Sequence, residues 1–292
     1  MSDVIASPTT RRMALEKGVD LDARARELGR RTMGPEDLGA SASVNAPAGD
    51  TSYWDVDHAA YGAVTAEPMS RFAQVAARNL GAANALIPQV THHDRAEISA
   101  IEMLRKSWRE DARARGIKLT ALAFHVMALA HCLREFPRFN ASLSADGTTL
   151  VLKDYVHIGI AVDTPHGLMV PVIRNADCKG LWDISREITD LAGRAQNRKV
   201  VPDEMGGASM TISNLGGIGG TAFTPIVNPP ELAILGITRS ETVTVWEGDT
   251  PRPVPMVPLD LSYDHRVLNG ADAARFLSRY GTLLASPRQL IM

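Results

Sequence analysis

The segment VHIGIAVDTPHGLMVPVI, residues 156–173, decides the fold class of this chain. It contains two apolar, β-branched runs, over residues 156–162 and 168–173, joined by Asp163-Thr164-Pro165-His166-Gly167, which has the composition of a turn. We therefore predict a β-hairpin here. Similar runs predict further strands over residues 209–213, 232–237, 242–246 and 257–263.

Helical patterns lie between and around these strands. Residues 118–133 are apolar nearly all round, which predicts a central, buried helix. Asp94, with Glu97 three residues on, predicts a helix start ahead of the apolar positions Ile98, Ile101, Leu104 and Trp108. Other helices are predicted over residues 68–79, 183–196 and 271–284. Because strands and long helices mix without strict alternation, the predicted class is α+β with a mixed sheet.

Composition excludes several classes of protein. The chain has 292 residues, of which 45% are hydrophobic and 22% charged, as in globular proteins. Its 31 basic residues nearly balance 33 acidic ones, so no basic field predicts nucleic-acid binding. No apolar run approaches the length of a membrane span, and no signal peptide is expected. Two cysteines without CxxC spacing favour a reducing compartment, and we predict a cytoplasmic protein.

The chain is predicted to contain two folded parts. Residues 39–50 are low in complexity and typical of a flexible linker. The predicted domains are a small helical module over residues 1–38, a linker over 39–56 and the main domain over 57–292. Within the module, Ser7-Pro8 predicts the start of a helix that ends near Gly18, and Asp20 predicts the start of a second segment.

Most of the eight histidines are poor candidates for chemistry. His125 and His131 lie in the apolar helix and are predicted to be buried or half-buried structural residues. His92-His93-Asp94 is not expected to bind a metal, because adjacent side chains point apart and no further ligand cluster follows.

His265 differs because it directly follows an apolar strand, in Tyr263-Asp264-His265-Arg266-Val267-Leu268-Asn269-Gly270. Histidine takes up and releases protons near neutral pH, and strand ends often display reactive groups. The alternative is local and structural: Asp264 and Arg266 form an ion pair, His265 has no function, and Asn269 only caps the next helix.

The second candidate is the strand 209–213, which runs from Ser213 into Asn214-Leu215-Gly216-Gly217-Ile218-Gly219-Gly220. Glycines let a backbone or a ligand approach closely. Dinucleotide binding is rejected because the prolines that follow, Pro225 onward, prevent the long helix that such a motif requires. A glycine-rich turn without catalytic function is the alternative.

Together, these two stretches resemble the catalytic domain of the dihydrolipoamide acyltransferases, the core component of 2-oxo acid dehydrogenase complexes. The resemblance runs from about Asp57 to Met292. It includes residues 87–91, 116–120, 155–165 and 170–174, the serine loop and Asp264-His265-Arg266, which carries the family's active-site signature. Asn269, with Gly-Gly-Thr-Ala-Phe-Thr-Pro over 219–225, is similar to the acetyltransferases of pyruvate dehydrogenase complexes in Gram-negative bacteria, which favours acetyl as the acyl group.

The resemblance implies a fold like that of chloramphenicol acetyltransferase and trimers with active sites between subunits. The C-terminal residues 289–292 are similar to an apolar tail that docks trimers into a larger cage. Coenzyme A, or acetyl-CoA, is the implied substrate, without a metal. The implied site residues are His265 as base, Ser213 at the oxyanion, Asn269 ordering the loop, Asp264 and Arg266 bracing it, and Arg71, a loose match to a basic residue near the pantetheine channel.

Residues 6–38 resemble the family's peripheral-subunit-binding domain, which docks the partner dehydrogenase subunits. Arg26-Glu27-Leu28 stands where that domain carries a Gly-Thr-Gly loop, which puts partner binding in question. No lipoyl-type hairpin with a lysine occurs in the 292 residues, so the lipoyl group is expected on a separate chain, acting in trans.

Two other functions stay open on the sequence. The chain could be a scaffold or partner-docking subunit whose catalysis is incidental, although the presence of both His265 and Ser213 argues against this. It could also transfer an acyl group from CoA to another small thiol, alcohol or amine.

Overall fold

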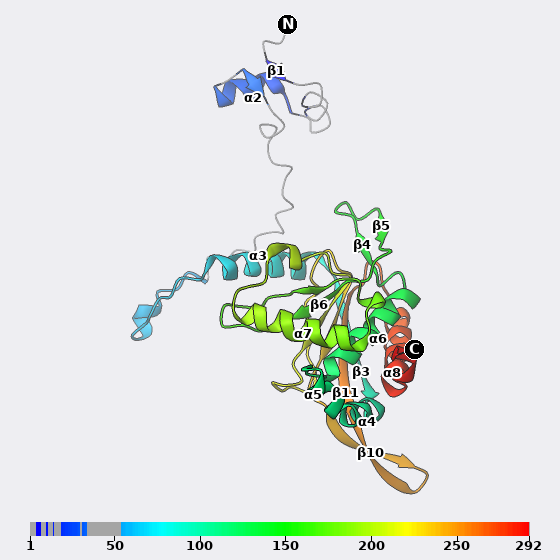
Figure 1. Ribbon diagram of the computed structural model, residues 1–292. Coiled ribbons are helices and arrows are strands. Elements are labelled where there is room, and N and C mark those ends of the chain that lie inside the picture. Colours follow the sequence, from blue (N-terminus) through cyan, green and yellow to red (C-terminus); the bar gives the residue numbers. More distant parts are fainter. Residues whose placement is uncertain are drawn as a thin grey trace. The chain divides into compact units, whose positions relative to one another are not determined.

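The computed structural model describes residues 4–6, 10, 14, 19–29, 31–33 and 54–291. These residues belong to two compact units, Met1–Ala66 and Glu67–Met292. Figure 1 shows the elements of both units. No helix among the described residues is long and apolar enough to cross a membrane.

The first unit contains a short helix and a two-stranded pair. Helix α2, Leu21–Leu28, is capped by Asp20, whose carboxylate accepts hydrogen bonds from the amides of Asp22 and Ala23. Strands β1, Ile5–Ala6, and β2, Thr32–Met33, pair in parallel, which was not predicted. The segment predicted to begin at Asp20 is therefore present. Of the helix predicted to start at Ser7-Pro8, only Thr10 and Ala14 are described, both as helical, and the linker 39–50 lies outside the described residues. A 3-10 helix, η3, covers His58–Tyr61.

The second unit is built on one mixed sheet. Its strands are β3 (Gln89–Glu97), β6 (Ile158–Ala161), β7 (Val172–Ile173), β8 (Met210–Asn214), β9 (Ala233–Ile237), β10 (Glu241–Glu247) and β11 (Thr250–Asp264). They are ordered β10-β11-β9-β8-β6-β7. Strand β3 also pairs with β11, along the edge opposite to the one that β9 occupies. β6 runs parallel to β8 and β8 to β9, while the remaining pairs are antiparallel. A separate hairpin joins β4 (Ala141–Leu143) and β5 (Leu150–Leu152).

Helices cover the two faces of this sheet unequally. They are α3 (Arg71–Leu86), α4 (Ser99–Ser107), α5 (Arg109–Ala114), α6 (Ala121–Glu135), α7 (Leu181–Gln196), α8 (Gly270–Ala285) and α9 (Arg288–Ile291), with 3-10 helices η4 (Ala176–Cys178) and η5 (Pro202–Glu204). The main core packs α6, α7 and α8 against one face. On the opposite face, Ala83 and Ile87, at the end of α3, pack against Ile234 and Val227.

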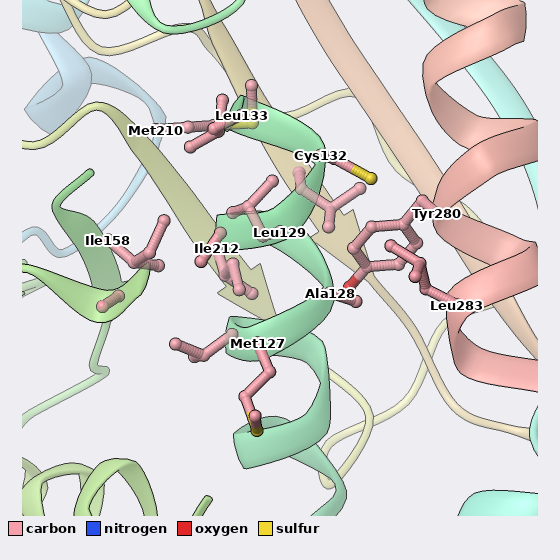
Figure 2. Close-up of a cluster of buried hydrophobic side chains, with 14 of the residues drawn as sticks. Met127, Ala128, Leu129, Cys132, Leu133, Ile158, Met210, Ile212, Tyr280 and Leu283 are labelled. Carbon is pink, nitrogen blue, oxygen red and sulfur yellow. The ribbon is translucent and has the colours of Figure 1, made fainter. Parts of the chain in front are cut away.

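Helix α6 occupies the centre of the main core, as its apolar surface predicts. Figure 2 shows its side chains between Ile158, Met210 and Ile212 of the sheet and Tyr280 and Leu283 of α8. Strand residues alternate between the faces. Met210 and Ile212 face α6, so Thr211 and Ser213 face the side of the sheet on which α3 lies.

The predicted α+β class with a mixed sheet is confirmed, and so is the hairpin, as β6 and β7. The predicted helix start at Asp94 is wrong. Asp94 lies within β3, opposite Leu259 of β11, and the helix begins only at Ser99. Pairing with the long strand β11 supplies the hydrogen bonds that make this polar stretch extended. Helix α3 also runs seven residues beyond the predicted end at Asn79.

Close packing of β6 against β8 leads to a stability prediction at Gly159. A Cβ atom there would lie 2.5 Å from Thr211 Oγ1 and 3.0 Å from Val170 Cγ1. We expect Gly159→Ala to lower the free energy of unfolding by about 1–3 kcal/mol in urea denaturation. Gly193→Ala is the matched control, since Gly193 lies in α7 with no atom within 4 Å of a Cβ. That variant should gain roughly 0.5–1 kcal/mol from helix propensity, and an equal loss in both variants would contradict the prediction.

Candidate active site

His265 lies immediately after the C-terminal end of β11, where it is exposed. Its backbone N–H donates to the carbonyl oxygen of Pro88 at 3.1 Å, and its ring centroid lies 5.8 Å from that of Tyr263. The long strand β11 therefore carries the imidazole to one end of the sheet and leaves it open to an incoming group.

A buried carboxylate fixes the loop that carries this histidine. The Asp264 side chain is only 2% exposed and accepts hydrogen bonds from the backbone N–H of Arg266 and from its guanidinium, at 2.6–3.2 Å. This contact raises the pKa of Arg266 above its ordinary value. The Asp264 carbonyl also accepts from the amides of Val267 and Leu268. The ion pair between Asp264 and Arg266, which the structural alternative contained, is thus present, and it closes the loop around His265.

Asn269 caps the helix that follows. Its Oδ1 accepts from the backbone N–H of Asp272 at 3.0 Å, and the Asp272 carboxylate accepts from the Asn269 backbone N–H at 3.4 Å. Asn is well suited to this position. Asn269 therefore fixes the start of α8, four residues after His265, which ties the histidine loop to a rigid element.

Ser213 is the second-last residue of β8 and is half-buried. It lies opposite Ala161 of β6 and Gly236 of β9. Within the described residues, its hydroxyl has no hydrogen-bond partner, so the hydroxyl is free to donate to another group. The chain then enters the predicted glycine loop, where Gly220 has φ 87°, a conformation that favours glycine.

One chain does not bring Ser213 and His265 together. Ser213 is directly opposite Gly236 of β9, and Gly236 is directly opposite Asp260 of β11. His265 follows Asp260 by five residues. At about 3.3 Å per residue along a strand and about 4.8 Å between strands, the two residues are roughly 19 Å apart. A reaction that uses both side chains therefore requires two copies of the chain.

Two of the cavities on the Ser213 side of the sheet lie along α3 and border Asn79. One, of about 550 Å³, is lined by Asp264, Arg266 and the C-terminal half of α3. The other, of about 360 Å³, is lined by Phe72 and Val170, among others. Arg71, by contrast, is the first residue of α3, and the 15 residues to Leu86 place it about 22 Å from the end nearest His265. Arg71 lines neither cavity.

Both cavities border Glu231, a residue that the sequence reasoning did not select. Glu231 is 4% exposed; its Oε1 accepts from Thr211 Oγ1 at 2.9 Å and from Asn228 Nδ2 at 3.1 Å, while Oε2 has no partner among the described atoms. Burial raises the pKa of Glu231 from 4.5 to about 7, although its hydrogen bonds and the nearby Lys153 act in the opposite direction. The signal in the sequence that could have pointed to Glu231 is its position directly before the apolar run Leu232–Ile237.

This buried carboxyl predicts a pH-dependent effect of Glu231→Gln. The folded chain binds the proton more tightly than the unfolded chain, so its free energy of unfolding falls as pH rises from about 4.5 to about 7. Glutamine keeps the acceptor for Thr211 and Asn228 but does not ionise. We expect the variant to be more stable than wild type by up to about 3 kcal/mol at pH 8 and by less than about 1 kcal/mol at pH 5.

Urea denaturation at the two pH values measures this difference. The control is Glu241→Gln, because the Glu241 side chain is 49% exposed. A Glu231→Gln gain that is the same at pH 5 and pH 8 would show that ionisation is not its cause.

Of the other histidines, His93, His125 and His157 make side-chain hydrogen bonds. His125 is buried, its Nδ1 lies 2.7 Å from the Tyr280 hydroxyl, and burial lowers its pKa to about 4, as expected for a structural residue. The expectation for His131 is wrong: it points outward from α6 and is exposed. His93 pairs with Asp260. Among the described residues, no three His, Cys, Asp or Glu side chains are grouped as a metal site.

Comparisons with known proteins agree with the resemblance. The sequence model described as 2-oxoacid dehydrogenases acyltransferase (catalytic domain) matches residues 61–292. The dihydrolipoyllysine-residue acetyltransferase components of the pyruvate dehydrogenase complexes of Pseudomonas aeruginosa and Azotobacter vinelandii are each 44% identical over 99% of this chain. The matches cover 55% and 47% of those proteins, so the chain spans about half the length of the curated relatives it matches.

Two solved structures of similar proteins also match this chain. A crystallographic and enzymatic study of a serine, a histidine and an asparagine in the catalytic mechanism of Azotobacter vinelandii dihydrolipoamide acetyltransferase provides a structure with 48% identity and a TM-score of 0.80. The match covers 81% of this chain and 98% of that one. A structure of the cubic core of the pyruvate dehydrogenase multienzyme complex matches with 49% identity, the same TM-score and the same coverage. The chain belongs to the 2-oxoacid dehydrogenase acyltransferase family.

Proposed function

We propose that this chain transfers an acetyl group between coenzyme A and a dihydrolipoyl thiol, with His265 as the base and Ser213 as the oxyanion donor. The observation that carries the proposal is a spacing. His265 follows Ser213 by 52 residues, and Asn269 follows His265 by four. The serine, histidine and asparagine studied in the Azotobacter vinelandii enzyme are separated by the same intervals.

The chemistry suits these side chains. The imidazole of His265 removes the proton from the attacking thiol as sulfur bonds to the thioester carbonyl carbon. A thiol of pKa about 8.5 and an imidazole of about 6.5 leave a mismatch of roughly 2.7 kcal/mol, which positioning offsets. The free hydroxyl of Ser213 donates to the oxyanion of the tetrahedral intermediate. When that intermediate collapses, the second sulfur leaves and takes the proton back from His265.

The supporting residues act through the loop. Asp264 and Arg266 close the backbone around His265, and Asn269 fixes the start of α8. Arg71 stays a prediction for the pantetheine channel, and its distance from the His265 end of α3 is consistent only with contact to a part of CoA far from the thiol.

We further propose that the active form is a trimer, or a cage built from trimers. Two observations support this assembly: the roughly 19 Å between Ser213 and His265 in one chain and the cubic core of the similar structure. A site formed by Ser213 of one copy and His265 of the next would repeat three times around a ring.

The first unit is proposed to dock dehydrogenase subunits of a bacterial, cytoplasmic complex. Helix α2 and the cluster of Val4, Ala25 and Met33 give the first unit a small core. Arg26 and Leu28, which replace the glycine loop of the resembling domain, lie inside α2, and the left-handed residue comes only at Gly29. Docking therefore has to use a surface without that loop.

The test is acetyl transfer from acetyl-CoA to free dihydrolipoamide and to a lipoyl domain added as a separate protein. We expect turnover with both acceptors and a higher kcat/KM with the lipoyl domain. Turnover only with another thiol, alcohol or amine would favour a different acceptor. Absence of turnover from assembled chains that co-purify with dehydrogenase subunits would favour the scaffold function.

A further inference from the structure

A histidine–aspartate pair lies on the same face of the sheet as Ser213. His93 of β3 and Asp260 of β11 are directly opposite each other, and His93 Nδ1 lies 2.6 Å from Asp260 Oδ1. The Asp260 side chain is 1% exposed, whereas that of His93 is 49% exposed. The reaction proposed above uses neither residue.

The same carboxylate holds the loop that follows Ser213. The backbone N–H of Phe223 donates to Asp260 Oδ2 at 3.2 Å. The loop is also held by Thr238 Oγ1, which donates to the Thr221 carbonyl, and by Gln89 Oε1, which accepts from the Val227 N–H. A buried carboxylate is costly unless it is paired, so His93 and the Phe223 N–H stabilise Asp260 jointly.

Strand register connects this pair to Ser213. Ser213 is opposite Gly236, Gly236 is opposite Asp260, and Asp260 is opposite His93, so the four residues form one row across the sheet. Residues directly opposite in a sheet share a face. Gly236 has no side chain, and the Phe223 ring takes its place, since a Cβ there would lie 2.7 and 2.8 Å from ring atoms. Across the sheet, the row therefore consists of the Ser213 hydroxyl, the Phe223 ring, the Asp260 carboxylate and the His93 imidazole.

We propose that His93 and Asp260 are positioning residues for the transfer reaction, which hold Phe223 over Gly236 and thereby fix the wall beside the Ser213 hydroxyl. The inference rests on the proposed function of Ser213. His93 holds the carboxylate, the carboxylate holds the Phe223 amide, and the ring excludes water from one side of the serine. A misplacement of about 1 Å near reacting groups is enough to lower turnover by up to about 10²-fold.

The test compares His93→Ala with His93→Gln in the full chain. Alanine removes the partner of Asp260 Oδ1, whereas the glutamine amide donates to the same oxygen. We expect His93→Ala to lower kcat about tenfold with KM for acetyl-CoA nearly unchanged, and His93→Gln to restore most of it. His92→Ala, one residue along β3 and opposite Leu261, controls for general damage to the strand.

Two further measurements separate positioning from a merely structural role. In a Phe223→Leu background, His93→Ala should have little further effect on kcat, because both act through the same ring. Amide hydrogen exchange of the peptide holding Phe223 should be at least about tenfold faster in His93→Ala than in wild type, because its N–H loses a fixed acceptor.

Unchanged kcat in His93→Ala, or effects of His93→Ala and Phe223→Leu that simply add, would overturn the proposal. If the wild-type chain transfers no acetyl group, the proposed function fails. In that case hydrogen exchange still decides the anchoring, since unchanged exchange at Phe223 would refute it without any assay of activity.

Discussion

Replacing His265 with alanine is expected to lower kcat for acetyl transfer about 10²–10⁴-fold, the usual contribution of a general acid–base group. The imidazole is exposed at the end of β11, and Asp264, Arg266 and the Pro88 carbonyl hold its backbone without using the ring. Alanine therefore removes the base and leaves the loop in place. Steady-state rates with acetyl-CoA and dihydrolipoamide measure the loss.

The matched control is His131→Ala, because His131 is also exposed but lies on α6. It should keep the wild-type rate. The urea midpoint of His265→Ala should equal that of wild type, which separates loss of chemistry from loss of fold. A His265→Ala chain that retains more than a tenth of wild-type kcat would remove this residue from the mechanism.

The sequence predicted those elements whose own pattern decides their structure. Helix α6 is apolar nearly all round, and its burial follows from that alone. The β6–β7 hairpin is specified by its turn residues. Strand β3 was mistaken for a helix start because Asp94 and Glu97 have the spacing of a helix cap, and only pairing with β11, some 165 residues away in the chain, makes them extended.

Some residues of the candidate site were likewise predicted from local motifs, and others were missed. His265, Ser213 and Asn269 stand at element boundaries, where motifs are visible in the sequence. Glu231 and the His93–Asp260 pair were missed because their environment is made by contacts across strands. The separation of Ser213 from His265 within one chain also depends on strand order, which no local pattern contains.

Ser213→Ala is expected to lower kcat about 10²–10³-fold, as removal of one oxyanion donor does. KM for acetyl-CoA should change little, because the hydrogen bond forms only when the carbonyl oxygen becomes charged. Ser213 lies in the middle of the sheet between β6 and β9, and its hydroxyl has no partner among the described residues, so alanine leaves no group unpaired. Ser278→Ala, on the exposed side of α8, is the matched control.

Mixing the two inactive variants tests whether the site joins two chains. Ser213→Ala and His265→Ala chains, unfolded together and refolded at equal concentrations, assort at random in a ring. A site that takes His265 from one copy and Ser213 from the next is then intact in about one case in four, so the mixture should regain roughly a quarter of wild-type activity. Each variant refolded alone stays near its own low rate. Because the strand register places the two side chains roughly 19 Å apart in a single chain, a mixture no more active than its components would mean that this register, or the pairing of Ser213 with His265, is wrong.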